Sequence, residues 1–130
     1  MVDAHFSFQT SSFTDSEDDL AENVNGIAGK ALAQWLAARL GAAGLDASEV
    51  WAEDHGWDFS VMRGETKYLC ACSIEADEET REAHVSLAKH RSLMDRMRGR
   101  NAYAADDPVV DAIRSALAGN PDVANLASEV

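Results

Sequence analysis

Residues 51–74 read WAEDHGWDFSVMRGETKYLCACSI, and this stretch decides the fold. Within it, Trp57, Phe59 and Val61 alternate with polar residues. Alternation with a period of two predicts a strand that buries one of its faces. Arg63-Gly64 then interrupts the alternation with residues typical of a hairpin turn. The stretch therefore predicts two antiparallel strands joined by a tight turn, and we expect a further short strand just before them.

The second predicted strand carries both cysteines of the chain. Cys70 and Cys72 share one face with Tyr68, while Leu69 and Ala71 lie on the other. A strand that is apolar on both faces is typical of the centre of a sheet. Residues two apart on a strand are ~6–7 Å from each other, whereas a disulfide needs Cβ atoms ~3.8 Å apart. We therefore expect reduced thiols, which favours a reducing compartment and a cytoplasmic location.

On the N-terminal side, the pattern predicts a strand and a helix. Residues His5–Thr10 alternate, as a half-buried strand does. From Leu20 to Leu40 apolar residues recur at helical spacing, and the acidic run 14–19 suits the start of one long helix. Asn25-Gly26 and Gly29 weaken the first half by about 1 kcal/mol per glycine relative to alanine. Either the helix begins near Gly26, or the glycines permit a close backbone contact.

On the C-terminal side, one segment has two interpretations. We expect the acidic residues 75–82 to form a loop. Ala83–His90 alternates as a strand does, but its helix-forming residues also allow a helix that continues to Arg98. We favour the strand, followed by a short helical turn at Leu93–Met97. Asp106-Asp107-Pro108 is then a typical start of a final helix.

These elements predict an α+β fold in one domain, residues 1–130. Its core is one antiparallel sheet of four to five strands, with a long helix after the first strand and a C-terminal helix packed on one face. The first strand must then pair with a strand that follows the long helix. We expect residues 1–4 to be frayed, and residues 124–130 to be either frayed or a short terminal piece packed through Leu126.

Length and charge limit the classes of function. A chain of 130 residues is too short for two independent cores. It has 23 acidic and 11 basic residues, a formal net charge of -12. Such a field repels phosphate backbones and anionic lipids, which disfavours nucleic acid and membranes and favours a basic protein partner. No apolar run approaches the ~20 residues that a membrane span needs, and the N-terminus has no secretory signal pattern.

The turn between two tryptophans is the richest cluster of chemistry-bearing residues. Its carboxylates and imidazole could transfer protons or hold a divalent cation in a cleft walled by the indoles. Alternatively it is a plain hairpin, in which Gly56 takes a positive φ and the tryptophans clamp the ends. We favour the hairpin, because neighbours in a turn rarely converge on one point. The candidate ligand or partner residues here are Trp51, Glu53, Asp54, His55 and Trp57.

Cys70, Cys72, His84 and His90 have a spacing that superficially resembles a zinc site. However, a C-x-C pair along a flat strand lacks the geometry of a zinc knuckle, and the two histidines would be about 20 Å apart on a strand. We therefore expect no metal site and no cofactor. The chain also has no nucleophile elbow or phosphate-binding loop, so we assign no catalytic residues.

Residues Lys89–Arg100 contain five basic residues and one aspartate in an otherwise acidic chain. The simplest interpretation is a solvated stretch that balances the acidic segments. Alternatively it contacts an anion or a partner, with Met94 and Met97 adding adaptable apolar area, or it binds nucleic acid. The candidate contact residues are Lys89, Arg91, Arg96 and Arg98.

The order of these segments resembles small uncharacterised bacterial domains that bear a Glu-Asp-x-Gly-Trp turn. The likeness rests on the Ala/Leu-rich helix 29–36, the turn 51–57, the basic segment 91–100 and a final helix. It covers most of the chain after Gly26. The residue before the glycine, which is aromatic in that pattern, is His55 here, and the resemblance implies no activity or functional residue.

The sequence therefore favours a small, acidic, cytoplasmic protein-interaction module that is not an enzyme and binds a basic partner. A second hypothesis is a small-ligand- or metal-binding protein, or an enzyme, that uses the turn Trp51–Trp57. A third is a nucleic-acid accessory protein that uses Lys89–Arg100. A homodimer formed through apolar positions on an edge strand is also compatible with the sequence.

Overall fold

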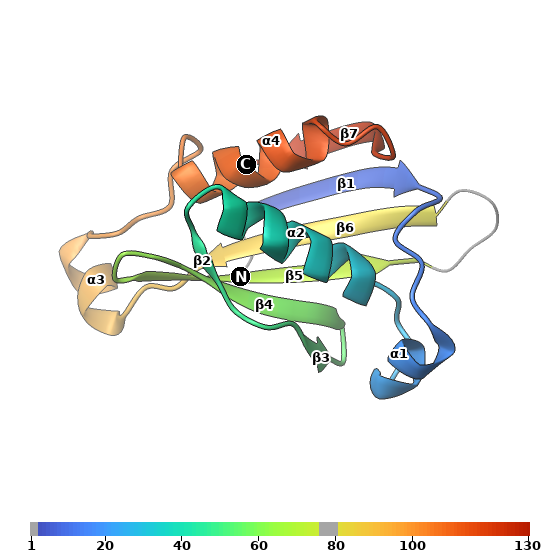
Figure 1. Cartoon of the computed structure of the whole chain (residues 1–130). Helices are drawn as coiled ribbons and strands as arrows, with labels where there is room; N and C mark the ends of the chain where they lie inside the picture. Colours follow the sequence, from blue (N-terminus) through green and yellow to red (C-terminus); the bar gives the residue numbers. More distant parts are fainter. Residues whose placement is uncertain (1–2, 76–80) are drawn as a thin grey trace.

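The computed structural model describes residues 3–75 and 81–130. In these residues, seven strands form one sheet with helices on one of its faces (Figure 1). The strands are β1 (Ala4–Thr10), β2 (Asp46–Ala47), β3 (Trp51–Glu53), β4 (Gly56–Arg63), β5 (Thr66–Ile74), β6 (Arg81–Lys89) and β7 (Ala124–Glu129). The helices are α1 (Glu17–Glu22), α2 (Lys30–Ala42), α3 (Leu93–Arg98) and α4 (Pro108–Ala118).

The sheet has the order β2-β4-β5-β6-β1-β7, and β3 also pairs with β4. Every pair is antiparallel. The first strand lies between β6 and β7, so it pairs with strands that follow α1 and α2, as predicted. Strand β5 lies between β4 and β6, which confirms the prediction of a central strand with apolar residues on both faces.

The core lies between the sheet and the two longer helices, α2 and α4 (Figure 1). Burial alternates along β1, where Phe6 and Phe8 are buried and their neighbours are more exposed, as the period of two predicts. Cys70 and Cys72 are free and buried on this helix-facing side. The helix residues that complete the core are Leu32, Ala33, Leu36 and Leu40 of α2 and Val109, Val110, Ile113 and Leu117 of α4.

The predicted long helix over residues 20–40 is wrong, because the structure divides it into α1 and α2. Gly29 has a φ of 143°, and a Cβ there would lie 2.8 Å from the Cys72 carbonyl oxygen. Gly29 therefore allows a close contact with the backbone of β5, and a helix cannot continue through a residue in this conformation. Asp15 caps the start of α2, because its carboxylate accepts hydrogen bonds from the backbone N–H groups of Gly29, Lys30 and Ala31.

The prediction of four to five strands is also wrong. It missed the two-residue strand β2, and it expected residues 124–130 to be frayed or a short terminal piece, whereas residues 124–129 form β7 beside β1. Both elements lie at the edges of the sheet and bury little apolar surface, so their sequences carry only a weak periodic signal. Backbone pairing with a neighbouring strand holds them in place.

The segment Ala83–His90, for which the sequence allowed a strand or a helix, is a strand up to Lys89. β6 spans Arg81–Lys89 and is followed by the short helix α3, so the continuous helix to Arg98 is wrong. Of the predicted acidic loop 75–82, residues 76–80 lie outside the described residues. On either side, the Glu75 N–H donates a 2.9 Å hydrogen bond to the Glu82 carbonyl, which continues the β5–β6 ladder. In the described part of the chain, no helix is long and apolar enough to cross a membrane.

Candidate functional site

The sheet face opposite the helices carries small and weakly polar side chains. Leu69 is 39% exposed there, and its neighbours on β5 and β6 are half-buried. They surround a shallow hollow of about 420 Å³ that His55 and His84 also line, and His84 pairs with Ser73 across the β5–β6 ladder. We call this surface the open face and define it by Leu69, Ala71, Ser73, Ser86 and Ala88.

Two asparagine side chains stabilise the turn between β3 and β4 through hydrogen bonds to its backbone. Asn23 is buried, and its side-chain amide donates to the carbonyl oxygens of Glu53 (2.8 Å) and Gly56 (3.0 Å). Asn25 donates to the Asp54 carbonyl at 2.7 Å. The turn is therefore a hairpin between β3 and β4 with a positive φ at Gly56, which agrees with the interpretation that the sequence favoured.

The two tryptophans do not wall one cleft. Trp57 is buried on the helix side, where its indole N–H donates to the Ile27 carbonyl at 2.8 Å. Trp51 pairs with Asp58, the residue after Trp57, so its side chain belongs to the opposite face of the sheet. Its indole N–H donates to the Glu53 carboxylate at 2.8 Å. The predicted indole-walled cleft is wrong because consecutive strand residues face opposite sides.

His55 lies between two carboxylates. Its Nε2 is 2.7 Å from Asp58 Oδ1, and its Nδ1 is 3.3 Å from Asp54 Oδ1. Burial raises the pKa of Asp58, although its hydrogen bond to His55 opposes this effect. Burial also acts to lower the pKa of His55, but the hydrogen bonds and charges of Asp58 and Asp54 outweigh it and raise that pKa. Because both ring nitrogens face carboxylates, His55 is suited to an ion pair and not to the activation of a nucleophile.

Sequence reasoning missed Asp58 as a partner of His55. Its side chain is only 3% exposed, which is rare for a carboxylate without a partner. The alternation in β4 carried the signal, because it places Asp58 on the open side, three residues after the histidine.

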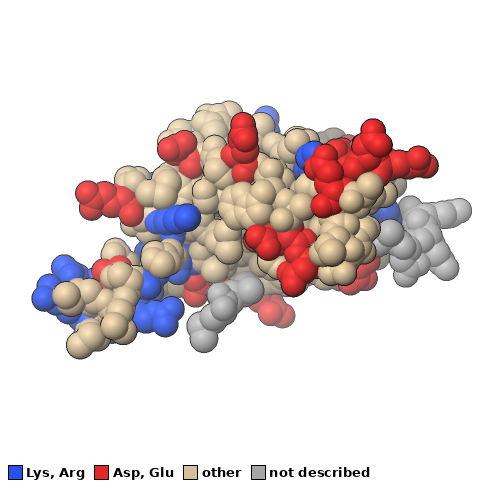
Figure 2. All heavy atoms as spheres, turned by 90° about the horizontal axis from the view of Figure 1, so that it is seen from below, with Lys and Arg blue, Asp and Glu red and all other residues tan. Residues whose placement is uncertain are grey.

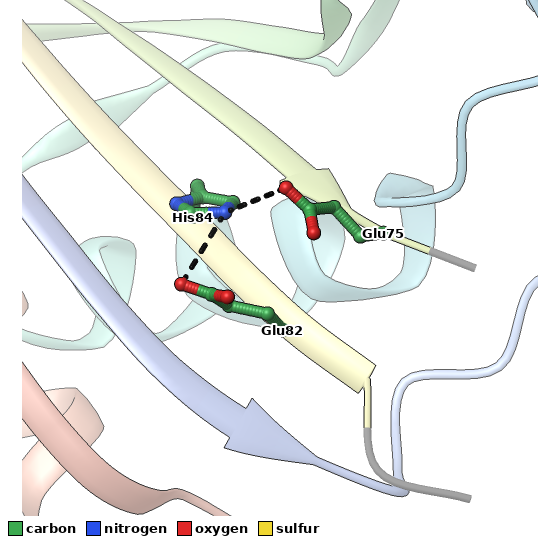
Figure 3. A group of neighbouring side chains, drawn as sticks. All are labelled: Glu75, Glu82 and His84. Atoms are coloured by element: carbon green, nitrogen blue, oxygen red, sulfur yellow. Dashed lines mark ion pairs between the residues drawn. The ribbon is translucent and has the colours of Figure 1, made fainter. Parts of the chain in front are cut away.

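A second imidazole group lies on the open face near the end of β5 and the start of β6 (Figure 3). His84 Nε2 is 3.4 Å from Glu75 Oε1 and 3.7 Å from Glu82 Oε1. Its other ring nitrogen, Nδ1, is 3.2 Å from His5 Nε2, and the two rings are stacked. Sequence reasoning considered His84 only as part of a zinc-like set and missed the other three residues. The registers of β1, β5 and β6 bring them together, and these registers are not visible in the sequence.

The cysteines belong to a different environment from that of His84. They point toward the helices, whereas His84 lies on the open side of β6. The hydrogen bond with Cys72, together with burial, raises the pKa of the Cys70 thiol well above its ordinary value. The thiol is therefore poorly suited to act as a nucleophile, and the set of two cysteines and two histidines does not form one site.

The basic segment contributes only part of its residues to the surface. The structure does not support Lys89 as a surface contact residue, because its side chain is only 8% exposed and its Nζ lies 3.8 Å from Asp107 Oδ2. Tyr68 donates to the same oxygen at 2.8 Å, so Lys89 belongs to a buried polar group beneath α4. Arg91 donates to backbone carbonyls of Arg100 and Asp95. The outward residues are Arg96, Arg98, Leu93, Met94 and Met97, all of them exposed.

Comparisons with protein-family models, curated proteins and solved structures find no match to this chain. The resemblance to bacterial domains with a Glu-Asp-x-Gly-Trp turn therefore stays a prediction.

Proposed function

We propose that this protein is a non-enzymatic interaction module whose open face binds a basic segment of a partner protein. One observation carries the proposal: the centre of the open face has small and apolar side chains where a solvated sheet face would carry long polar ones. Leu69 pairs with Ala88 and Ala71 pairs with Ser86 there, and Ser73 follows Ala71 on the same face. The neighbouring Asp58 carboxylate is buried against His55, and a centre of small and apolar side chains inside a polar rim is the usual organisation of a protein interface.

Exposed carboxylates at the rim favour a basic partner. The side chains of Asp54, beside His55, and of Glu75 and Glu82, beside His84, are 80%, 64% and 52% exposed. With a net charge of -12, they would steer a cationic segment toward the face and set its orientation.

The titratable groups support a binding role over catalysis. Among the described residues, His55 is held between carboxylates and Cys70 is buried with a raised pKa. Neither arrangement supplies an activated nucleophile with a free base beside it. The alternative of an enzyme at the Trp51–Trp57 turn therefore has less support than a binding surface.

A position-specific cross-link tests the proposal. The photoreactive residue p-benzoylphenylalanine would replace Ala71 on the open face or, as the matched control, exposed Ala38 on α2. After irradiation in the native host, we expect position 71 to give a covalent adduct with a basic protein and position 38 to give none.

The variants Ala71→Glu and Ala38→Glu then test the contact without a probe. We expect Ala71→Glu to weaken binding of the identified partner at least ~10-fold and Ala38→Glu to leave it unchanged, because a charge at the centre of an interface is desolvated without a partner. Adducts only with a second copy of the chain, or equal effects of the two variants, would contradict the proposal.

A further inference from the structure

We propose that Glu75, Glu82 and His84 bind one divalent transition-metal ion, with Zn²⁺ as the representative ion. The proposal does not rest on the partner-binding function, because this chain alone supplies the three ligands, although Glu75 and Glu82 are also among the rim carboxylates of the open face. Figure 3 shows the three side chains pointing toward one another from β6 and the end of β5. One ligand atom of each lies within 4.8 Å of the other two.

The sheet register holds the three residues in place. Ser73 pairs with His84 and Ile74 with Ala83, so the next pair along the ladder is Glu75 with Glu82. The hydrogen bond from the Glu75 N–H to the Glu82 carbonyl confirms that this pairing continues. Residues two apart share a face, so Glu82 and His84 project on the same side of β6, toward Glu75. The backbone therefore already has the geometry that a metal site needs.

The distances match those between zinc ligands. Nitrogen and oxygen ligands lie ~2.0–2.1 Å from Zn²⁺, and tetrahedral geometry then places them about 3.4 Å from each other. The distances from His84 Nε2 to the two carboxylates are 3.4 and 3.7 Å. Both glutamates are exposed, so their flexible side chains can adjust to close the third edge of the site.

The charges also favour a cation. Glu75 and Glu82 are directly opposite across two antiparallel strands, where like charges destabilise a sheet. An ion with a charge of +2 would neutralise both carboxylates and convert this repulsion into two ligand bonds. An imidazole with two carboxylates suits ions of intermediate softness such as Zn²⁺ better than Ca²⁺ or Mg²⁺, which prefer oxygen ligands alone.

His5 would fix the orientation and the tautomer of the His84 ring. A metal at His84 Nε2 needs the lone pair of that nitrogen, so the ring proton must reside on Nδ1. The His84 Nδ1–H can then donate to His5 Nε2, 3.2 Å away. A hydrogen bond from the second ring nitrogen to a neighbouring acceptor is the usual support of a metal-binding histidine. His5 is therefore a positioning residue and not a ligand.

Calorimetric titration of the tag-free full-length protein with zinc chloride tests the site. We expect one Zn²⁺ per chain. His84→Ala and the charge-removing variants Glu75→Gln and Glu82→Gln should each weaken binding at least ~10-fold, and His5→Leu should weaken it ~10-fold through loss of the orienting acceptor. The controls are His55→Gln, which alters the other histidine–carboxylate group, and the exposed His90→Ala, and both should bind as the original protein does.

Two further measurements distinguish a variant that has lost the metal site from one that has failed to fold. Saturating Zn²⁺ should raise the melting temperature of the original protein and of His90→Ala but not of His84→Ala. The ¹⁵N resonance of His84 Nε2 should shift on addition of the ion. Absence of binding, or binding that survives His84→Ala and is lost in His55→Gln, would overturn the proposal. Loss of metal binding with intact partner binding would separate it from the proposed function.

Discussion

At the scale of single residues, the Cys72 carbonyl organises the region around the turn. Gly29 approaches it from the start of α2, and Gly56 approaches it from the start of β4. A Cβ at Gly56 would lie 2.4 Å from the Cys72 oxygen, and the φ of Gly56 is 148°. No side chain fits in this position without displacement of the β5 backbone.

The variant Gly56→Ala should therefore lower the free energy of unfolding by about 2–4 kcal/mol, since it combines a strained φ with a steric clash. Gly64→Ala is the matched control: its φ is also positive, at 63°, but nothing lies within 4 Å of the added Cβ. It should cost only about 1 kcal/mol. Urea denaturation of both variants measures the difference, and equal losses would mean that the contact with Cys72 is unimportant.

His55 makes stability depend on pH. Its pKa is raised in the folded protein, so its contribution is complete below the ordinary pKa of histidine and is lost as the pH rises through the raised value. The raised pKa of Asp58 acts in the same direction at lower pH, because its carboxylate ionises less readily when folded. Half of the His55 side chain is exposed, which limits the effect to about 0.5 kcal/mol.

Melting curves at pH 6 and pH 8 check this prediction. We expect the original protein to lose about 2 °C more than His55→Gln does between these values. His90→Gln, which changes an exposed histidine away from the turn, should behave as the original protein does. A variant His55→Gln with the same pH dependence as the original protein would show that the ion pair contributes nothing.

At the scale of elements, sequence reasoning succeeded where one face of an element is buried. The alternation of Phe6 and Phe8, and that of Tyr68, Cys70 and Cys72, predicted β1 and β5 because every second side chain enters the core. It failed for the helix over residues 20–40, although its glycines were noticed. Helical spacing records which residues are buried, and it does not record a backbone contact such as that between Gly29 and Cys72.

The candidate sites were predictable only in part, for a related reason. His55 and its neighbours attracted attention because they are adjacent in sequence. Glu75, Glu82, His84 and His5 are brought together by three strands, and their pairing depends on register, which local patterns do not specify.

No helix forms between α1 and α2, and the side chain of Asn23 connects this segment to the β3–β4 turn through a set of hydrogen bonds that we call the polar clamp. Asn23 donates to two carbonyls of the β3–β4 turn and accepts from the N–H groups of Asn25 and Ile27. Its truncation would leave buried backbone groups without partners.

We expect Asn23→Ala to lower the free energy of unfolding by about 2–3 kcal/mol. Asn25→Ala, which removes one exposed hydrogen bond, should cost less than about 1 kcal/mol. Thermal unfolding followed by circular dichroism compares the two variants. If Asn23→Ala melts as Asn25→Ala does, the clamp is not a principal link between the helical segment and the turn.

At the scale of the whole molecule, charge is distributed unevenly. Figure 2 shows basic side chains gathered at the end formed by α3 and acidic side chains over α1 and along the rest of the visible face. Helix α3 buries none of its residues, so its arginines do not depend on the core for their position. With a net charge of -12, the carboxylates of the chain repel one another.

Salt should consequently act in opposite directions on stability and on binding. Raising NaCl from 10 to 300 mM shortens the screening length from ~30 Å to below ~10 Å and weakens the repulsion among carboxylates. The melting temperature of the free protein should then rise by about 2–4 °C. The same change should weaken binding of a basic partner, because it screens the attraction between the two proteins.

A double variant, Glu49→Lys with Glu65→Lys, replaces two exposed carboxylates away from the open face and should show a smaller rise in melting temperature with salt. A melting temperature that is constant or falls with salt would mean that the acidic side chains already have sufficient cationic partners within the fold.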